Sequence, residues 1–157
     1  MNKVTIYTDG ACKGNPGPGG WGAVLIWMKQ PDDKHYYKDI YGGDPYTTNN
    51  VMELRACIEA LNCLRGECSV TMYTDSKYVK QGITTWIKTW KNNGWLTYHK
   101  TPVANKELWA ALDKLVMKHK VKVYWTKGHN NNEFNERADA LANMGCESVK
   151  HLALTTA

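Results

Sequence analysis

The hydrophobic and polar positions of this chain alternate at first and later recur with helical spacing. Residues 3–8 alternate as Lys-Val-Thr-Ile-Tyr-Thr, which predicts a strand, and "WGAVLIWMK" at 21–29 predicts a second, well-buried strand. A more polar run at 31–46 begins with turn residues and predicts a third strand. Residues 11–20 are rich in glycine and proline and indicate a turn. Three runs joined by short turns predict an antiparallel meander.

Helical periodicity begins after residue 50 and then alternates with two further strands. The predicted elements are helices at 54–64, at 78–90 and from about residue 105, strands at 69–74 and 121–128, and a last helix that carries residues 138–142. Gly66 stops the first helix, and Gly82 weakens the second without ending it. The final ten residues are expected to form a frayed tail.

The element order β-β-β-α-β-α-α-β-α determines the expected fold class. A strand followed by a crossover helix and another strand implies parallel pairing of the late strands. We therefore predict an α/β fold whose mixed five-stranded sheet has antiparallel first strands, parallel late strands and helices on both faces. A chain of 157 residues is most simply one domain. We place that domain at 1–147 and a C-terminal tail at 148–157.

Two of the predicted strands end on the same tripeptide, Tyr-Thr-Asp, at Asp9 and at Asp75. If these strands are parallel neighbours, about 4.8 Å apart, the two carboxylates lie side by side. Two carboxylates this close cannot both ionise cheaply, and a bound divalent cation reverses that penalty. Ligand sets made only of oxygen suit magnesium or manganese.

Each acidic residue also has a simpler interpretation. Asp75 precedes a helix and could be its N-cap, and Asp9 precedes a glycine and could be a turn residue. Glu53 follows Asn50 at capping-box spacing, but it also lies at the edge of the apolar stripe of its helix. No local rule selects Asp139, in the last helix, over the other acids.

Composition narrows the class of protein. No apolar run approaches the length of a membrane span, and the N-terminus shows no signal peptide. Five irregularly spaced cysteines, without a Cys-x-x-Cys pair, indicate free thiols in a cytoplasmic protein and argue against zinc. The net charge of +5 favours an anionic partner such as nucleic acid, although a basic surface also serves solubility.

The glycine-rich run "GPGGWG" at 17–22 matches G-x-G-x-x-G, the dinucleotide-binding pattern. A strand rather than a helix follows it, so no helix N-terminus is available for a pyrophosphate, and we reject that interpretation. We expect a glycine hairpin between the first two strands, whose small residues also let a nucleic-acid backbone approach.

Six segments in order resemble the type 1 ribonuclease H family over residues 3–145. They are "YTDGACKGNPGPGGWG", "TTNNVMELRACIEAL", "YTDSKYVKQGITTWI", "WKNNGW", "VYWTKGH" and "NERADALA". The resemblance implies a ribonuclease H-like sheet, with the first, fourth and fifth strands parallel. It also implies an endonuclease that cuts the RNA strand of RNA–DNA hybrids and leaves 3′-hydroxyl and 5′-phosphate ends.

The resemblance assigns roles to particular residues. The family's four carboxylates fall on Asp9, Glu53, Asp75 and Asp139, and its loop histidine falls on His129. They imply hydrolysis assisted by two Mg²⁺ ions, or Mn²⁺, with one ion activating water and the other stabilising the leaving 3′ oxygen. Substrate contacts are expected from the following residues: Cys12, Asn15, Thr48, Asn49, Asn50, Lys77, Trp86, Trp90, Lys91 and Asn135.

The segment "WIKTWKNNGWLTYHK" at 86–100 resembles the family's basic protrusion, in which tryptophans and lysines interleave. Such a mixture suits a DNA strand, but Trp86 at least also has the spacing of a residue that packs one helix on another. Bacterial relatives often carry consecutive basic residues where this chain has Lys91-Asn92-Asn93, so weaker binding by the protrusion is expected.

Our leading interpretation is a monomeric, cytoplasmic, metal-dependent nuclease for RNA–DNA hybrids that does not bind membranes. Two rivals remain at this point. An integrase- or transposase-like nuclease would cut duplex DNA and use fewer acids. A binding module without catalysis would bind the hybrid and show no turnover that depends on magnesium.

Overall fold

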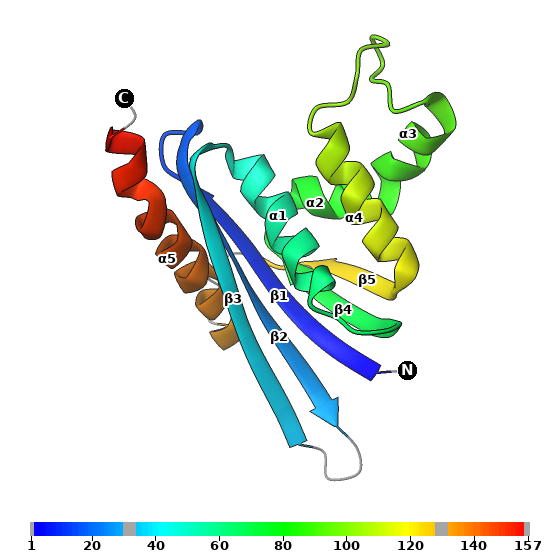
Figure 1. The fold of residues 1–157 in the computed structure, drawn as a ribbon. Coiled ribbons are helices and arrows are strands. Elements are labelled where there is room, and N and C mark those ends of the chain that lie inside the picture. Colours follow the sequence, from blue (N-terminus) through cyan, green and yellow to red (C-terminus); the bar gives the residue numbers. More distant parts are fainter. Residues whose placement is uncertain (1, 30–33, 128–131, 156–157) are drawn as a thin grey trace.

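The computed structural model contains one mixed five-stranded sheet (Figure 1). It describes residues 2–29, 34–127 and 132–155. The strands are β1 (Asn2–Cys12), β2 (Gly17–Lys29), β3 (Lys34–Thr47), β4 (Cys68–Thr74) and β5 (Lys120–Trp125). Their order across the sheet is β3-β2-β1-β4-β5. The pairs β1–β2 and β2–β3 are antiparallel, and β1–β4 and β4–β5 are parallel, so the predicted mixed topology is confirmed.

The first two strands are longer than the sequence predicts. β1 does not end at Asp9 but continues to Cys12, and Gly20, placed in a turn by its composition, pairs with Ala11 inside β2. The expected glycine turn therefore shrinks to residues 13–16. A Cβ on Gly20 would lie 2.1 Å from the carbonyl oxygen of Ala142, so glycine here lets a helix approach the sheet closely.

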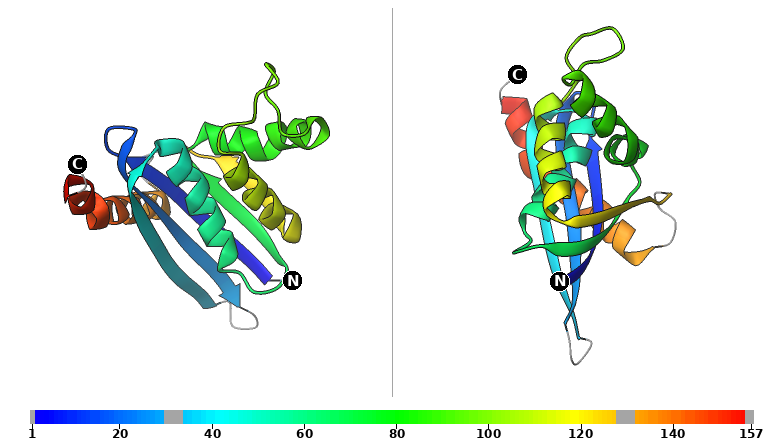
Figure 2. Two further views of the ribbon diagram at one scale, coloured as in Figure 1. Left: turned by 45° about the horizontal axis from the view of Figure 1, so that its top comes forward. Right: turned by 90° about the vertical axis from the view of Figure 1, so that its right-hand side faces the viewer.

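Helices cover both faces of the sheet, as predicted. They are α1 (Asn49–Asn62), α2 (Lys77–Gln81), the π-helical turn η1 (Gly82–Trp86), α3 (Ile87–Asn93), α4 (Lys106–Lys118) and α5 (Glu133–Thr155). In the left view of Figure 2, α1 and α5 lie on opposite sides of the long strands. The main core fills the space under α1 and α4; its largest fully buried side chains include Ile6, Leu25, Leu54, Leu61, Met72, Trp109 and Leu112.

The second predicted helix is present but irregular. It divides into α2, η1 and α3, and the π-helical turn begins at Gly82. A Cβ on Gly82 would lie 1.9 Å from Cη2 of Trp109, an indole that is fully buried. Close packing on this indole therefore requires glycine, and the insertion that a π-turn provides occurs at the same point.

The last helix extends further than the sequence suggests. The residues from 148 onward are helical through Thr155, so the expectation of a frayed tail there is wrong. The division into a domain at 1–147 and a tail stays a prediction. Within the described residues, no helix is both long and apolar enough to cross a membrane.

Candidate active site

Two parallel strands bring Asp9 and Asp75 together. The register pairs Tyr7 with Tyr73 and Thr8 with Thr74, so Asp9 and Asp75, which follow, are neighbours at the point where the β1–β4 pairing ends. Carboxylate oxygens of Asp9, Glu53 and Asp75 lie within 4.8 Å of one another. Asp139 lines the same hollow, whose volume is about 420 Å³. The structure thus brings together all four acids that the sequence singled out.

Glu53 reaches this hollow from the second turn of α1. The N-cap of α1 is Thr48, whose Oγ1 accepts a hydrogen bond from the backbone N–H of Val51 at 3.3 Å. Glu53 is therefore too far along the helix to belong to a capping box, and that interpretation is wrong. Its side chain is buried, with a residue exposure of 4%.

Asp75 is likewise not a helix cap. Ser76 caps α2, because its Oγ accepts from the backbone N–H of Val79 at 3.1 Å. The indole Nε1 of Trp125, at the end of β5, donates to the backbone oxygen of Asp75 at 2.8 Å. The hydrogen bond ties the end of β4 to its parallel neighbour, so the position of the acid is fixed by the sheet.

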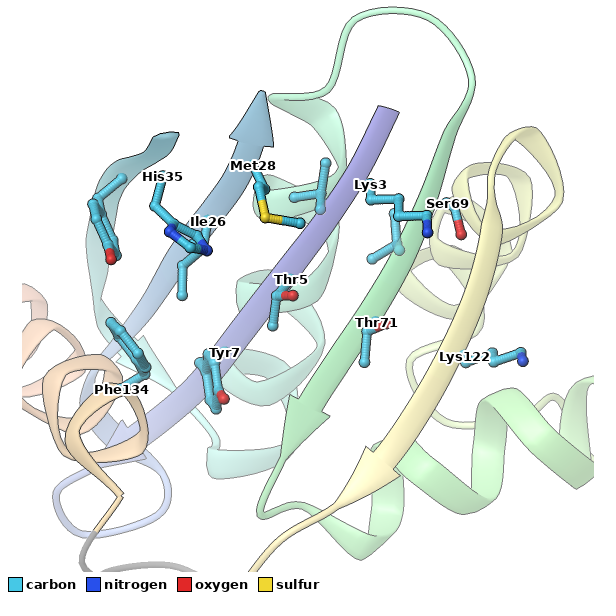
Figure 3. A pocket seen from close by; sticks show the side chains of 13 residues that line it. Lys3, Thr5, Tyr7, Ile26, Met28, His35, Ser69, Thr71, Lys122 and Phe134 are labelled. Carbon is cyan, nitrogen blue, oxygen red and sulfur yellow. The ribbon is translucent and has the colours of Figure 1, made fainter. Parts of the chain in front are cut away.

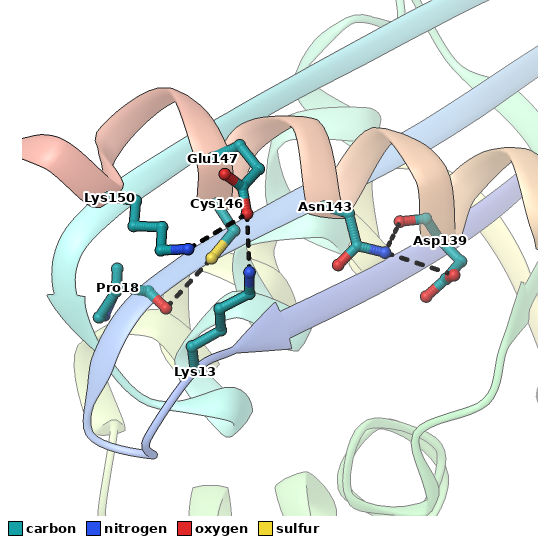
Figure 4. A network of polar contacts seen from close by, with 7 residues as sticks. All are labelled: Lys13, Pro18, Asp139, Asn143, Cys146, Glu147 and Lys150. Atoms are coloured by element: carbon teal, nitrogen blue, oxygen red, sulfur yellow. Dashed lines mark hydrogen bonds and ion pairs between the residues drawn. The ribbon is translucent and has the colours of Figure 1, made fainter.

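Asp139 comes from α5, on the other side of the hollow. Nδ2 of Asn143, one turn later, donates to the backbone oxygen of Asp139 at 3.0 Å and lies 3.4 Å from its Oδ2 (Figure 4). Further along the helix, Glu147 forms an ion pair of 2.7 Å with Lys13, which follows β1. The ion pair and the close approach of α5 to β2 hold the helix that carries the fourth acid.

The crowded acids resist ionisation. Burial, followed by the charge of Asp75 and by Asp139, raises the pKa of Asp9 to about 9, although the N–H of Gly10 opposes this by donating to Oδ1 at 2.9 Å. Burial and the neighbouring charge of Asp9 hold the pKa of Glu53 well above its usual range. Without a counter-charge, the site therefore retains protons at neutral pH.

The donor set fits a hard divalent cation. Oε2 of Glu53 is buried and has no hydrogen-bond partner within the described residues, an arrangement that costs free energy unless another group binds there. The three closest acids offer only oxygen atoms, which are the ligands that Mg²⁺ and Mn²⁺ prefer. A cation would satisfy the orphaned oxygen and offset the mutual repulsion of the carboxylates.

Several of the predicted substrate-binding residues surround the acids. Asn49 and Asn50, at the start of α1, line the hollow itself. Asn15 Oδ1 accepts from the backbone N–H of Asn49 at 2.8 Å, and Cys12 Sγ donates to the backbone oxygen of Thr47 at 3.3 Å. The turn after β1 and the start of α1 therefore form one connected polar surface next to the acids. Thr48 lies in this surface as the cap of α1.

On the other side, Lys77 lines the hollow and its Nζ lies 4.9 Å from the ring centre of Trp125. Asn135 Nδ2 donates to Oγ1 of Thr126 at 3.1 Å, which joins α5 to the end of β5. His129 lies outside the described residues. Ser76 also lines the hollow, and sequence reasoning missed it; a serine between a strand and a helix was the available signal.

The residues expected in the protrusion have structural partners. The rings of Trp86 and Trp90 pack on the buried Trp109, with centroid separations of 6.5 and 5.5 Å. Both tryptophans, not Trp86 alone, therefore pack on a buried ring, and both remain half-buried with some exposed surface. Lys91 Nζ lies 3.1 Å from Asp113 on α4, so its charge is partly neutralised inside the protein. Lys88 remains exposed.

An oxygen-rich acidic hollow at the carboxyl ends of parallel strands is a site for a hydrolase that binds metal ions and an anionic substrate. The RNase H family model matches residues 1–147. The ribonuclease H of Alcanivorax borkumensis is 54% identical over 151 residues, which cover 96% of each chain. That of Cupriavidus necator is 53% identical over 149 residues, which cover 95% of this chain and 99% of the relative.

Solved structures agree with these relatives. LC9-RNase H1, described as a type 1 RNase H with the type 2 active-site motif, matches with a TM-score of 0.85 at 31% identity, over 94% of this chain and 74% of that one. LC11-RNase H1, solved in complex with an RNA/DNA hybrid, matches with a TM-score of 0.66 at 25% identity, over 93% and 98%. The chain therefore belongs to the RNase H family, and the prediction of an enzyme of this family is confirmed.

Proposed function

We propose that this chain is an endonuclease that hydrolyses the RNA strand of RNA–DNA hybrids, with Asp9, Glu53, Asp75 and Asp139 as its catalytic and metal-binding residues. The observation that carries the proposal is the convergence of these acids in one hollow, where three of them place oxygens within 4.8 Å. The named relatives and the hybrid complex of LC11-RNase H1 support the substrate class.

Two Mg²⁺ ions, or Mn²⁺, would supply an activated water and charge stabilisation of the leaving 3′ oxygen, so that the products carry 3′-hydroxyl and 5′-phosphate ends. The chain's own part is to hold the ligand oxygens in place. Asp9 and Asp75 are fixed by the parallel register of β1 and β4, and Glu53 and Asp139 are fixed by helices that pack on opposite faces of the sheet. Preorganised charge of this kind lowers the barrier because little rearrangement is needed during reaction.

We assign substrate recognition to the polar surface beside the acids. Amide side chains both donate and accept hydrogen bonds, which suits the 2′-hydroxyl of RNA and the edges of bases in the minor groove. This assignment is supported by the position of Asn49 and Asn50 in the lining of the acid hollow and by the hydrogen bond between Asn15 and Asn49. Cys12 and Thr48 belong to the same surface, and Asn135 and Lys77 extend it toward β5.

The remaining assignments complete the proposal. His129 assists proton transfer or product departure. Trp86, Trp90 and Lys91 contribute to DNA binding through the protrusion, with an affinity that is modest because Lys91 already has an acidic partner. The enzyme acts as a cytoplasmic monomer.

The test is to incubate the protein with labelled RNA–DNA hybrid, duplex RNA and duplex DNA, with and without Mg²⁺. Magnesium-dependent cleavage of the RNA strand in the hybrid alone is expected. Cleavage of duplex DNA would favour an integrase-like nuclease, and binding without turnover would favour a module that lacks catalysis. A second readout is the melting temperature: Mg²⁺ should raise it in the wild type and not in Asp9→Asn, because ligand binding stabilises only a chain that retains the site.

A further inference from the structure

A second pocket lies on the same face of the sheet as Asp9 and Asp75. It lies nearer the amino-terminal ends of β1 and β4, where Lys3 and Ser69 line it. Its volume is about 560 Å³, and strands β1 to β5 and the first turn of α5 contribute to it (Figure 3). The floor carries the hydroxyl groups of Thr5, Ser69 and Thr71. Lys3 and Lys122 stand at its rim, and no carboxylate is among the described residues that line it.

One wall of this pocket belongs to a series of five aromatic rings, which we call the aromatic ladder: Tyr37, Phe134, Tyr7, Tyr73 and Tyr124. Successive ring centroids lie 6.0, 5.4, 4.9 and 5.6 Å apart, and the interplanar angles do not exceed 32°. The rings at the two ends are the most exposed, with Tyr37 at 53% and Tyr124 at 46%, whereas the three rings between them are half-buried. The ladder thus offers exposed ring surface at both ends, with the ring of His35 beside that of Tyr37 at 6.4 Å.

Two lysines give the pocket side of the ladder a positive charge. Lys122 lies next to Tyr124 on the same face of β5, and Lys3 lies on the same face of β1 as Tyr7. The nearest acid on β3, Asp39, is neutralised by Arg137, whose Nε donates to Asp39 Oδ2 at 2.9 Å. Lys3 and Lys122 form no ion pair within the described residues. Rings, hydroxyl groups and these cations together match a ligand that combines flat apolar bases with phosphates and sugars.

The ladder is also continuous with the acids. Tyr7 precedes Asp9 by two residues and Tyr73 precedes Asp75 by two, so each tyrosine lies on the same strand face as the acid, roughly 7 Å away along the strand. A strand that leaves a duplex at the acids would therefore reach the ladder directly. The passage of a substrate strand from the acids to the ladder rests on the proposed function, whereas the composition of the pocket does not depend on it.

We infer that the aromatic ladder and its lysine rim bind single-stranded nucleic acid, such as the unpaired tail that flanks a hybrid. Bases stack on the exposed rings or pack against ring edges, and phosphates contact Lys3 and Lys122. An acidic protein segment would use the lysines but would gain little from a row of aromatic rings. The observations therefore favour a nucleic acid over an acidic partner protein.

The test uses two matched double variants and fluorescence anisotropy. Lys122→Gln with Tyr124→Ser removes one cation and one ring from the ladder. Lys118→Gln with Tyr36→Ser makes the same changes elsewhere: Lys118 is exposed on α4, and Tyr36, 44% exposed, points to the opposite face of β3 from Tyr37. Binding of labelled ten-nucleotide oligo-dT and oligo-U is measured in EDTA at low salt. The Lys122→Gln/Tyr124→Ser variant should bind both about tenfold more weakly than the wild type does. The control should match the wild type.

Equal binding by both double variants would overturn the inference, as would oligoglutamate competing as well as an unlabelled oligonucleotide of equal charge. Cleavage provides the second measurement: the KM for a hybrid with a single-stranded tail should rise in Lys122→Gln/Tyr124→Ser, while the kinetics on a blunt hybrid stay at the wild-type level. If no hybrid is cleaved at all, the proposed function fails, but the anisotropy result still decides whether the ladder binds single strands.

Discussion

Two rows of side chains cross β1 and β4 on one face of the sheet, and they differ in what holds them together. The tyrosines of the ladder contact one another, with the rings of Tyr7 and Tyr73 stacked at 4.9 Å. Two residues further along the same strands, Asp9 and Asp75 repel one another, and burial raises the pKa of Asp9 to about 9. The row of tyrosines stabilises the fold by itself, whereas the row of acids lowers the stability of the fold unless a cation is present. A loss of stability of this kind is typical of a functional site.

The largest expected effect comes from changing one residue of each kind, Tyr73 in β4 and Asp75 directly after it. Asp75→Asn removes one charge from the proposed metal site and should lower the rate of hybrid cleavage by more than about a hundredfold. Tyr73→Phe keeps the ring in the ladder and should cleave a blunt hybrid at the wild-type rate. The measurement is a single-turnover assay in Mg²⁺, with circular dichroism to show that both variants are folded. Comparable losses of cleavage rate in the two variants would mean that the Asp75 carboxylate has no specific role in the reaction.

The next effect concerns the stability of the protein without metal as a function of pH. The folded pKa of Asp9, about 9, exceeds its unfolded value near 4, so the folded state retains a proton that the unfolded state releases. The contribution to stability is therefore fully present below about pH 4 and is lost as the pH rises toward about 9, at up to about 1.4 kcal/mol per pH unit. Asp9→Asn cannot ionise and should flatten this decline.

Urea unfolding in EDTA at several pH values between about 5 and 8 measures this slope, since the unfolded carboxyl is ionised throughout and the folded one is not. Tyr7→Phe is the control. Burial raises the pKa of the Tyr7 phenol, so that group stays neutral over the same range and its removal should leave the slope unchanged. A wild type whose stability falls with pH no more steeply than that of Asp9→Asn over this range would show that Asp9 is already ionised in the folded protein.

The two faces of the sheet differ in how much of their structure could be predicted from the sequence. Under α1 the core consists of apolar side chains such as Leu54 and Leu61, whose helical spacing is visible in the sequence. The repeated Tyr-Thr-Asp indicated that Asp9 lies beside Asp75 if their strands are parallel neighbours. The family resemblance implied that pairing, and the structure has it.

The opposite face carries a weaker signal. Helix α5 approaches β2 through the backbone, where Gly20 lies against the carbonyl oxygen of Ala142, and such a contact leaves no periodic pattern of large side chains. Asp139 therefore could be selected only by family resemblance. The same contact explains why glycines that are typical of a turn belong to a strand.

The smallest effect separates ring stacking from simple burial within the ladder. Tyr73 lies between two rings, at 4.9 and 5.6 Å, whereas Tyr124 has one ring neighbour in the ladder. Because each stacked pair contributes about 1 kcal/mol beyond burial, Tyr73→Ala should lower the free energy of unfolding by about 2–3 kcal/mol and Tyr124→Ala by about half as much. Urea unfolding at about pH 5, where the acids contribute little to the difference, gives both values. Equal losses would mean that the rings act as separate surface residues, and the contrast with the acids would then rest on charge alone.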